Sequence, residues 1–144
     1  MSADKPLRVV VHIDGGSRGN PGPAASGIVV AEAGSGQVLQ EAGIFLGRAT
    51  NNVAEYRGLL EGLRLAGQLR AEEVEIVSDS QLLVCQMNGQ YRVKNPGLIP
   101  LHRQAGELAA KFRKCSFRHV RREENHHADR LVNQALDLQQ DVRP

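Results

Sequence analysis

The sequence predicts an α/β fold built on a five-stranded mixed sheet flanked by helices. Five short segments are rich in Val, Ile and Leu, and only turns separate the first three. The later ones alternate with segments whose apolar residues recur every three or four positions. Short turns favour antiparallel pairing, whereas helical crossovers join parallel strands. We therefore expect an antiparallel meander of three strands followed by parallel strands.

The strands are expected at residues 7–14, 25–33, 38–47, 72–79 and 115–121. The first, LRVVVHID, has a nearly continuous apolar body, which is typical of a strand buried on both faces. The segment GGSRGNPGP at 15–23 is expected to form a turn, because its Gly and Pro residues permit close backbone approach.

Helices are expected at residues 51–69, 80–88, 97–112 and 124–139. In the first, Val53, Tyr56, Leu59 and Leu63 follow helical spacing. The chain of 144 residues fits a single domain, 1–144, in which we expect residues 1–6 and 140–144 to be flexible.

Charge and composition set limits on the class of protein. Charged residues are 24% and the formal net charge is only +2, so attraction to nucleic acid must come from local arrangement. Three small basic groups could supply it, although solvated surface charge explains any single group as well. They are Lys111, Arg113 and Lys114; Arg118, Arg121 and Arg122; and Arg92 with Lys94.

The chain has no run of 18 apolar residues, and its start, MSADKPLR, lacks a signal-peptide core. These features predict a cytoplasmic protein without membrane contact, and we expect a monomer. Cys85 and Cys115 are expected to be reduced in that compartment, although their spacing does not exclude a disulfide.

Four acidic residues lie where predicted strands end or helices begin. Asp14 closes VVVHID, Asp79 closes VEIVSD, Glu55 lies in ATNNVAEYRGLL and Asp129 in ENHHADRLV. Open α/β sheets bind ligands at the carboxyl ends of strands, so we expect the four carboxylates to meet at one rim. They would repel one another unless a cation neutralised them, and hard oxygen ligands indicate Mg²⁺ or Mn²⁺. The pattern predicts metal-assisted phosphoryl transfer.

Each acid alone also has an ordinary explanation. These are a capping box for Glu55 with Asn52, a helix cap for Asp79, an ion pair with Arg122 or Arg130 for Asp129, and turn initiation for Asp14. Their joint placement at matching ends of one sheet favours the metal site.

Polar residues near these acids are candidates for substrate contact. The glycine segment lacks the Lys-Ser/Thr of a P-loop but suits a backbone held against a polymer's sugar edge, where it could bond a 2′-hydroxyl. Thr50 and Asn51 could contact phosphate and ribose at a helix N-terminus, or simply cap that helix. Gln81 and Ser80 could add contacts beside Asp79.

Two further groups of residues were weighed as binding sites. His126 and His127 are neighbours on a predicted helix and point about 100° apart, so solvated or substrate-facing histidines are favoured over metal ligands. A basic-polar lobe suits a DNA backbone as well as it suits an ordinary loop. Its members are Tyr91, Arg92, Lys94 and Asn95.

Taken together, DGGSRGNPGPAASG, ATNNVAEYRGLLEGL, VSDSQLLV and ENHHADRLVNQAL resemble type 1 ribonuclease H, in that family's segment order, over residues 8–138. The resemblance implies a ribonuclease H-like fold and an endonuclease that cleaves the RNA strand of RNA–DNA hybrids. It also implies 3′-hydroxyl and 5′-phosphate ends and two metal ions, roughly 3.5–4 Å apart. Mg²⁺ or Mn²⁺ would be the cofactor and the hybrid the partner.

The resemblance assigns roles residue by residue. The catalytic and metal-binding positions are Asp14, Glu55, Asp79 and Asp129. The positions implied to contact substrate are Gly15, Ser17, Asn20, Thr50, Asn51 and Gln81, with Thr50 at the DNA phosphate.

The sequence departs from the family pattern in two places. Many members carry a histidine in the loop before the last Asp, where this chain has VRREEN, so the substitute is open among His119, His126, His127 and Glu124. Between Met87 and Pro96 the chain has only NGQYRVKN in place of a basic protrusion, as in the compact bacterial and archaeal subgroup. Modest, salt-sensitive hybrid affinity is therefore expected.

Two other functions are compatible with the predicted sheet. A hybrid-binding module without catalysis would be favoured by loss of one acid, but all four are present. A 3′–5′ exonuclease on the same sheet would carry a paired D-x-E at the first strand, where this chain has Asp14-Gly15-Gly16.

Overall fold

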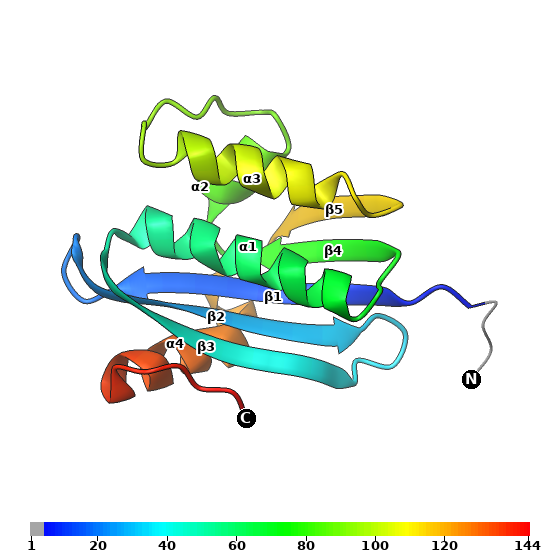
Figure 1. Ribbon diagram of the computed structural model, residues 1–144, viewed down its shortest axis with the longest axis horizontal. Helices are drawn as coiled ribbons and strands as arrows, with labels where there is room; N and C mark the ends of the chain where they lie inside the picture. Colours follow the sequence, from blue (N-terminus) through cyan, green and yellow to red (C-terminus); the bar gives the residue numbers. More distant parts are fainter. Residues whose placement is uncertain (1–4) are drawn as a thin grey trace.

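A five-stranded mixed sheet in the order β3-β2-β1-β4-β5 forms the centre of the computed structural model, which describes residues 5–144 (Figure 1). Antiparallel pairing joins β1 to β2 and β2 to β3, whereas β4 runs parallel to β1 and β5 parallel to β4. The predicted meander followed by parallel strands is confirmed. The strands are β1 (Arg8–Ser17), β2 (Gly22–Glu32), β3 (Val38–Ala49), β4 (Glu73–Ser78) and β5 (Lys114–His119).

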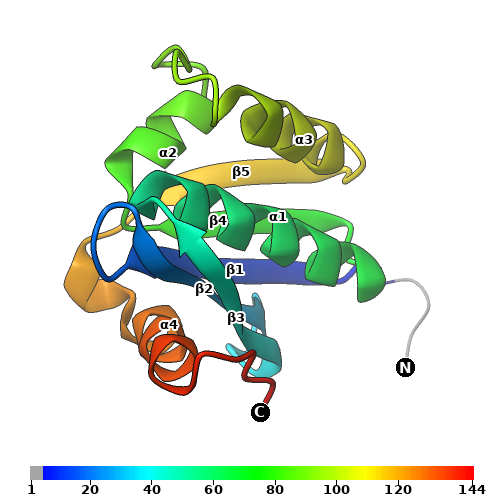
Figure 2. The same cartoon turned by 60° about the vertical axis from the view of Figure 1, so that its left-hand side comes forward.

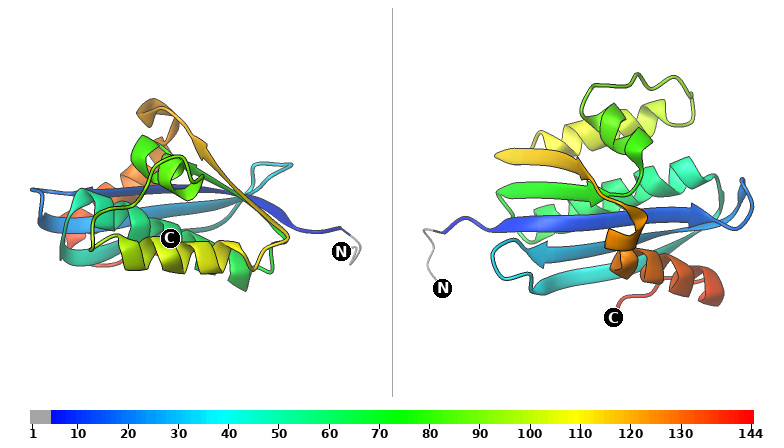
Figure 3. Two further views of the ribbon diagram at one scale, coloured as in Figure 1. Left: turned by 90° about the horizontal axis from the view of Figure 1, so that it is seen from above. Right: turned by 180° about the vertical axis from the view of Figure 1, so that it is seen from behind.

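The helices lie on both faces of this sheet. α1 (Asn51–Gln68), α2 (Gln81–Met87) and α3 (Ile99–Ala109) share one face, while α4 (His126–Leu138) crosses the other over β2 and β3 (Figures 2 and 3). A short 3₁₀ turn, η1 (Arg122–Glu124), leads into α4, so that helix begins two residues later than predicted. This layered arrangement leaves one end of the sheet open between α1 and α4.

The main core lies between α1 and the sheet. Its fully buried side chains include Val11, Ile13, Ile28, Leu59 and Ile76, and α1 presents its apolar stripe to them. The expectation that β1 is buried on both faces is wrong. Val9, Val11 and Ile13 are buried, but Val10 and His12 are only partly covered, because α4 lies over β2 and β3 and leaves this part of the other face open.

The glycine-rich segment forms less of a turn than predicted. β1 continues to Ser17 and β2 begins at Gly22, so residues 18–21 alone form the connection. Residues 14–17 pair with the small residues 24–27 of β2, from Asp14 opposite Gly27 to Ser17 opposite Ala24. Asp14 is therefore inside β1 rather than at its end, although the pairing of β1 with β4 stops one residue earlier, at Ile13 and Ser78.

The C-terminal residues lie against the edge strand β3. Val142 and Gly43 exchange two backbone hydrogen bonds of 2.7 Å, and the Asp141 carboxylate accepts from the Phe45 amide at 2.9 Å. Asp141 and Val142 therefore have hydrogen-bond partners on β3, which the polar composition of residues 140–144 did not indicate. The N-terminal segment expected to be flexible falls mostly on residues 1–4, outside the described residues.

The structure bears on the state of the two cysteines and on membrane-spanning helices. Cys85 and Cys115 are both free thiols, and burial raises the pKa of Cys115 to about 11. Within residues 5–144, no helix combines the length and the apolar composition needed to cross a bilayer.

Candidate active site

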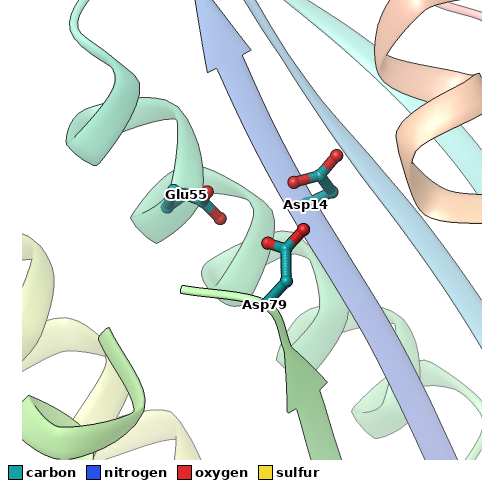
Figure 4. Close-up of side chains that lie close together, drawn as sticks. All are labelled: Asp14, Glu55 and Asp79. Atoms are coloured by element: carbon teal, nitrogen blue, oxygen red, sulfur yellow. The ribbon is translucent and has the colours of Figure 1, made fainter. Parts of the chain in front are cut away.

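Three of the four predicted acids meet at the open end of the sheet. Asp14 projects from β1, Glu55 from α1, and Asp79 directly follows β4 (Figure 4). Each offers one carboxylate oxygen, and these oxygens all lie within 4.8 Å of one another. Among residues 5–144, this is the one group of three or more His, Cys, Asp or Glu side chains so placed.

Asp129 reaches the same place from the other side of the sheet. It lies in the first turn of α4, and its charge contributes to the raised pKa of Asp14. All four acids line one open cavity of about 480 Å³. The structure therefore brings together four residues that are separated by up to 115 positions in the chain.

Local features of the sequence explain how the first three acids converge. β1 and β4 are parallel neighbours in register to Ile13 and Ser78, so the next residues of the two segments, Asp14 and Asp79, start side by side. A side chain at Gly15 would overlap the main chain of α1 where Glu55 begins, so this glycine lets α1 rest directly on β1. The close contact brings Glu55 over the cavity.

The environment makes this cluster of carboxyls costly to ionise. Burial, and then the charges of Asp79 and Asp129, raise the pKa of Asp14 to about 8. Burial, and then Asp14 and Asp79, raise the pKa of Glu55 well above its usual range, against the opposing effect of the Gly15 backbone. Burial also raises the pKa of Asp79, while the charge of Arg122 opposes that shift.

These residues fit a divalent cation. One carboxylate oxygen of Glu55, Oε2, is fully buried and has no hydrogen-bond partner among the described residues. An orphaned buried oxygen is costly unless it is bound to a cation or protonated. The surrounding ligands are carboxylate oxygens without thiols or imidazoles, the set that Mg²⁺ and Mn²⁺ prefer.

Three of the residues implied to contact substrate form a hydrogen-bond network beside the acids. The Asn51 side-chain oxygen accepts from the Ser17 amide at 2.8 Å, and the Asn20 side-chain oxygen accepts from the Asn51 amide at 3.0 Å. The network joins the β1–β2 hairpin to the start of α1. The side-chain nitrogens (Nδ2) of Asn20 and Asn51, by contrast, have no hydrogen-bond partner within residues 5–144, so they are available as donors.

The structure also decides between the alternatives for the helix caps. Thr50 is the N-cap of α1 and accepts from the Val53 amide at 3.2 Å, so the capping box between Asn52 and Glu55 is wrong. Ser80, and not Asp79, caps α2. No ion pair of Asp129 is found among the described residues; instead, Asn133 donates to its main-chain oxygen at 3.2 Å.

Not every predicted contact residue lies on the cavity. Gly15, Ser17 and Asn51 line it, whereas Asn20 does not line it but accepts a hydrogen bond from the backbone of Asn51. Thr50 and Gln81 lie outside the lining, at the starts of α1 and α2. The lining residues that the sequence did not assign to the site are Gly16, Arg18, Arg122, Val132, Asn133 and Leu136.

Arg122 is the most informative of the unassigned residues. The sequence suggested a surface basic group or an ion pair with Asp129 for it, but the structure places it on the cavity, where its charge opposes the rise in the pKa of Asp79. Of the residues suggested to replace the loop histidine, His119 lies beside an acid, with Nε2 at 3.3 Å from the main-chain oxygen of Asp79. His127 instead pairs with Glu41 at 3.3 Å. The position of Arg122 depends on the path of η1, for which the sequence carries no clear signal.

The chain is similar to known proteins over most of its length. A family described as reverse transcriptase-like matches residues 12–135. Ribonuclease HI of Halobacterium salinarum is 42% identical over 137 residues, which cover 95% of this chain and 68% of that protein. The bifunctional protein Rv2228c of Mycobacterium tuberculosis is 51% identical over 131 residues, 91% of this chain but 36% of that protein. The chain thus spans about a third of the length of this mycobacterial relative.

Solved structures agree with the sequence comparison. The N-terminal RNase H domain of Rv2228c superposes with a TM-score of 0.89, over 92% of this chain and 95% of that one. LC11-RNase H1, solved in complex with an RNA/DNA hybrid, is 39% identical and superposes with a TM-score of 0.85, over 91% of this chain and 98% of that one. The match in sequence, sheet order and fold shows that the chain belongs to the type 1 ribonuclease H family.

Proposed function

We propose that this chain is a divalent-metal-dependent endoribonuclease that hydrolyses the RNA strand of RNA–DNA hybrids to 3′-hydroxyl and 5′-phosphate ends. The observation that carries the proposal is the convergence of Asp14, Glu55, Asp79 and Asp129 on one open cavity. Relatives named ribonuclease HI, and a related enzyme in complex with an RNA/DNA hybrid, support the substrate class.

The four carboxylates would hold the metal. Two Mg²⁺ or Mn²⁺ ions bound there would lower the pKa of an attacking water and neutralise charge on the leaving 3′-oxygen. The protein's part is to fix the carboxylates before substrate arrives, which the β1–β4 register and the contact of Gly15 with α1 achieve. Such preorganisation places charge where the transition state needs it without later rearrangement.

The network of Ser17, Asn20 and Asn51 would position the RNA strand. Its side-chain oxygens are already used inside the protein, so each asparagine presents its N–H₂ group outward. Such donors can bond the 2′-hydroxyl that distinguishes RNA from DNA. Thr50 would meet a DNA phosphate at the positive end of α1, and Gln81 would extend the contacts beyond Asp79.

Positive charge near the cavity would help a polyanion approach the acids. Arg18 and Arg122 both line the cavity, and Arg18 is held by Asp137 of α4 at 2.7 Å. Among residues 5–144 these are the two basic side chains that line the cavity beside four acids, so affinity for the hybrid should be modest and should fall with salt. Because one chain supplies all four carboxylates, the protein would be active as a monomer. The two free thiols fit a location in the reducing environment of the cytoplasm.

A single cleavage assay tests this proposal. End-labelled hybrid, RNA duplex and DNA duplex are incubated with the protein and Mg²⁺ or Mn²⁺, with and without chelator, and the product ends are analysed. We expect internal cuts in the RNA strand of the hybrid alone or preferentially, 5′-phosphate ends, and no cutting with chelator. Binding without cutting would favour the hybrid-binding module, and stepwise shortening from the 3′ end would favour an exonuclease.

The variant Asp79→Asn supplies the control within the site. It removes a ligand charge from a residue that is only partly buried, so the fold should remain while cleavage is lost. Near-normal turnover by this variant, at equal folding, would contradict the assignment of the acids.

A further inference from the structure

Asn125 is a nearly inaccessible polar residue that none of the roles above uses. It lies between η1 and α4, and only 1% of its surface is exposed. Its Nδ2 donates to the main-chain oxygen of Ile13 at 2.8 Å, while its Oδ1 has no partner among the described residues. A buried side-chain amide whose oxygen has no partner is costly, so the one bond made by its nitrogen calls for a specific explanation.

That bond links the two segments that carry Asp14 and Asp129, β1 and the start of α4. Ile13 immediately precedes Asp14 and is the last residue of β1 to pair with β4. On its other side, the main-chain oxygen of Asn125 accepts from the amide of Asp129 at 3.1 Å. One residue therefore connects the backbone next to Asp14 with the backbone of Asp129.

Two glycines bring the backbone of α4 close to the sheet, beside the apolar contacts that Leu131 and Val132 make with β2. A side chain at Gly27 would overlap the carbonyl oxygen of Ala128, and one at Gly43 would come within 2.5 Å of the carbonyl oxygen of Leu131. These glycines set how closely the helix approaches β2 and β3. Apolar contacts have no preferred direction, whereas the hydrogen bond of Asn125 fixes the first turn of α4 at one point of β1.

We propose that Asn125 is a positioning residue, whose amide fixes the first turn of α4 on β1 and so holds the Asp129 carboxylate against Asp14 for metal binding and hydrolysis. Its effect on turnover rests on the proposed function, but its effect on metal affinity does not. Groups that hold metal ligands in place typically contribute 10–100-fold to affinity or activity. A shift of the carboxylate of about 1 Å has a similar effect on rate.

The test uses Asn125→Ala and Asn125→Leu, because the second keeps most of the side-chain volume without a donor. His102→Ala is the matched control: the ring Nε2 of His102 bonds the main-chain oxygen of Gln86 at 3.2 Å, a comparable tie between α3 and α2 away from the acids. Each protein is checked for cooperative unfolding. Hybrid cleavage then gives kcat and KM, and calorimetric titration with Mn²⁺ gives metal affinity.

We expect both Asn125 variants to fold, with kcat lowered 10–100-fold, KM within about threefold of wild type and Mn²⁺ affinity lowered about tenfold. His102→Ala should keep wild-type kcat and Mn²⁺ affinity. Wild-type values in the Asn125 variants would overturn the proposal, and so would failure of both to fold under conditions where His102→Ala folds. If the wild-type protein does not cleave hybrid, the proposed function fails, and the Mn²⁺ affinities still decide the role of Asn125.

Discussion

Replacing Asp14 by Asn should stabilise the metal-free protein while it abolishes cleavage. Asp14 is 6% exposed and lines the same cavity as three other acids. Its pKa is raised from 3.8 to about 8 in the folded protein. An amide of the same size carries no charge at any pH, so Asp14→Asn removes the cost of placing a carboxylate there.

The sign and size of the effect follow from that pKa. Because the folded state holds the proton more tightly than the unfolded state, the folded state is favoured below the unfolded pKa and loses stability as pH rises from about 4 towards 8. At pH 7 the loss has a ceiling of about 4 kcal/mol. The remaining acids still repel one another and share protons, so we expect Asp14→Asn to recover about 1–3 kcal/mol.

Thermal unfolding in chelator measures this gain. For a chain of this size, about 1–3 kcal/mol corresponds to a rise in Tm of roughly 3–10 °C near pH 7. The rise should shrink towards pH 4.5, where wild-type Asp14 is protonated in the folded state. The control is Asp137→Asn, the same substitution at a side chain that is 66% exposed on α4, and it should change Tm little at either pH.

A variant that is less stable than wild type in chelator would refute the reasoning. So would a gain in Tm that is equal at pH 4.5 and pH 7, because the cost would then not arise from ionisation of Asp14.

Three further predictions concern the same site. Adding Mg²⁺ or Mn²⁺ should raise the Tm of the wild-type protein at pH 7 and should raise that of Asp14→Asn far less; equal shifts would show that the ions bind elsewhere. Gly15→Ala should lower stability by about 1–3 kcal/mol in denaturant titration and reduce cleavage, because the added methyl overlaps the main chain of α1; Gly67→Ala on the same helix, where a side chain meets open space, is the control. Asn51→Asp keeps the oxygen that accepts from Ser17 but replaces the N–H₂ group with a negatively charged carboxylate oxygen, so KM for hybrid should rise about tenfold with little change in Tm; an unchanged KM would remove Asn51 from the substrate contacts.

Much of the fold could be predicted because apolar periodicity reports burial directly. The helical spacing in 51–69 and the apolar runs of β1 and β4 are set by the core they share, so the elements and their order follow from the pattern. The β1–β2 hairpin was less readable. Next to its connection, residues 15–17 pair with residues 24–26, and these Gly, Ala and Ser residues carry little hydrophobic signal even though they continue the ladder.

The acids of the site could be predicted because charges beside apolar strands are costly and therefore conspicuous. Arg122 and Asn125 could not, since their roles depend on the path of η1 around the sheet and on one hydrogen bond to Ile13. The contact of Val142 with β3 escaped prediction for a similar reason: it uses backbone groups, and backbone groups are the same for every residue type.

The most direct test of the account is a crystal structure with Mn²⁺ and a hybrid that cannot be cleaved, in which anomalous scattering locates the ions. We expect two peaks roughly 3.5–4 Å apart among Asp14, Glu55, Asp79 and Asp129, with the RNA strand beside them. Hybrid bound with its RNA strand away from these four carboxylates, or Mn²⁺ found only elsewhere on the protein, would contradict it.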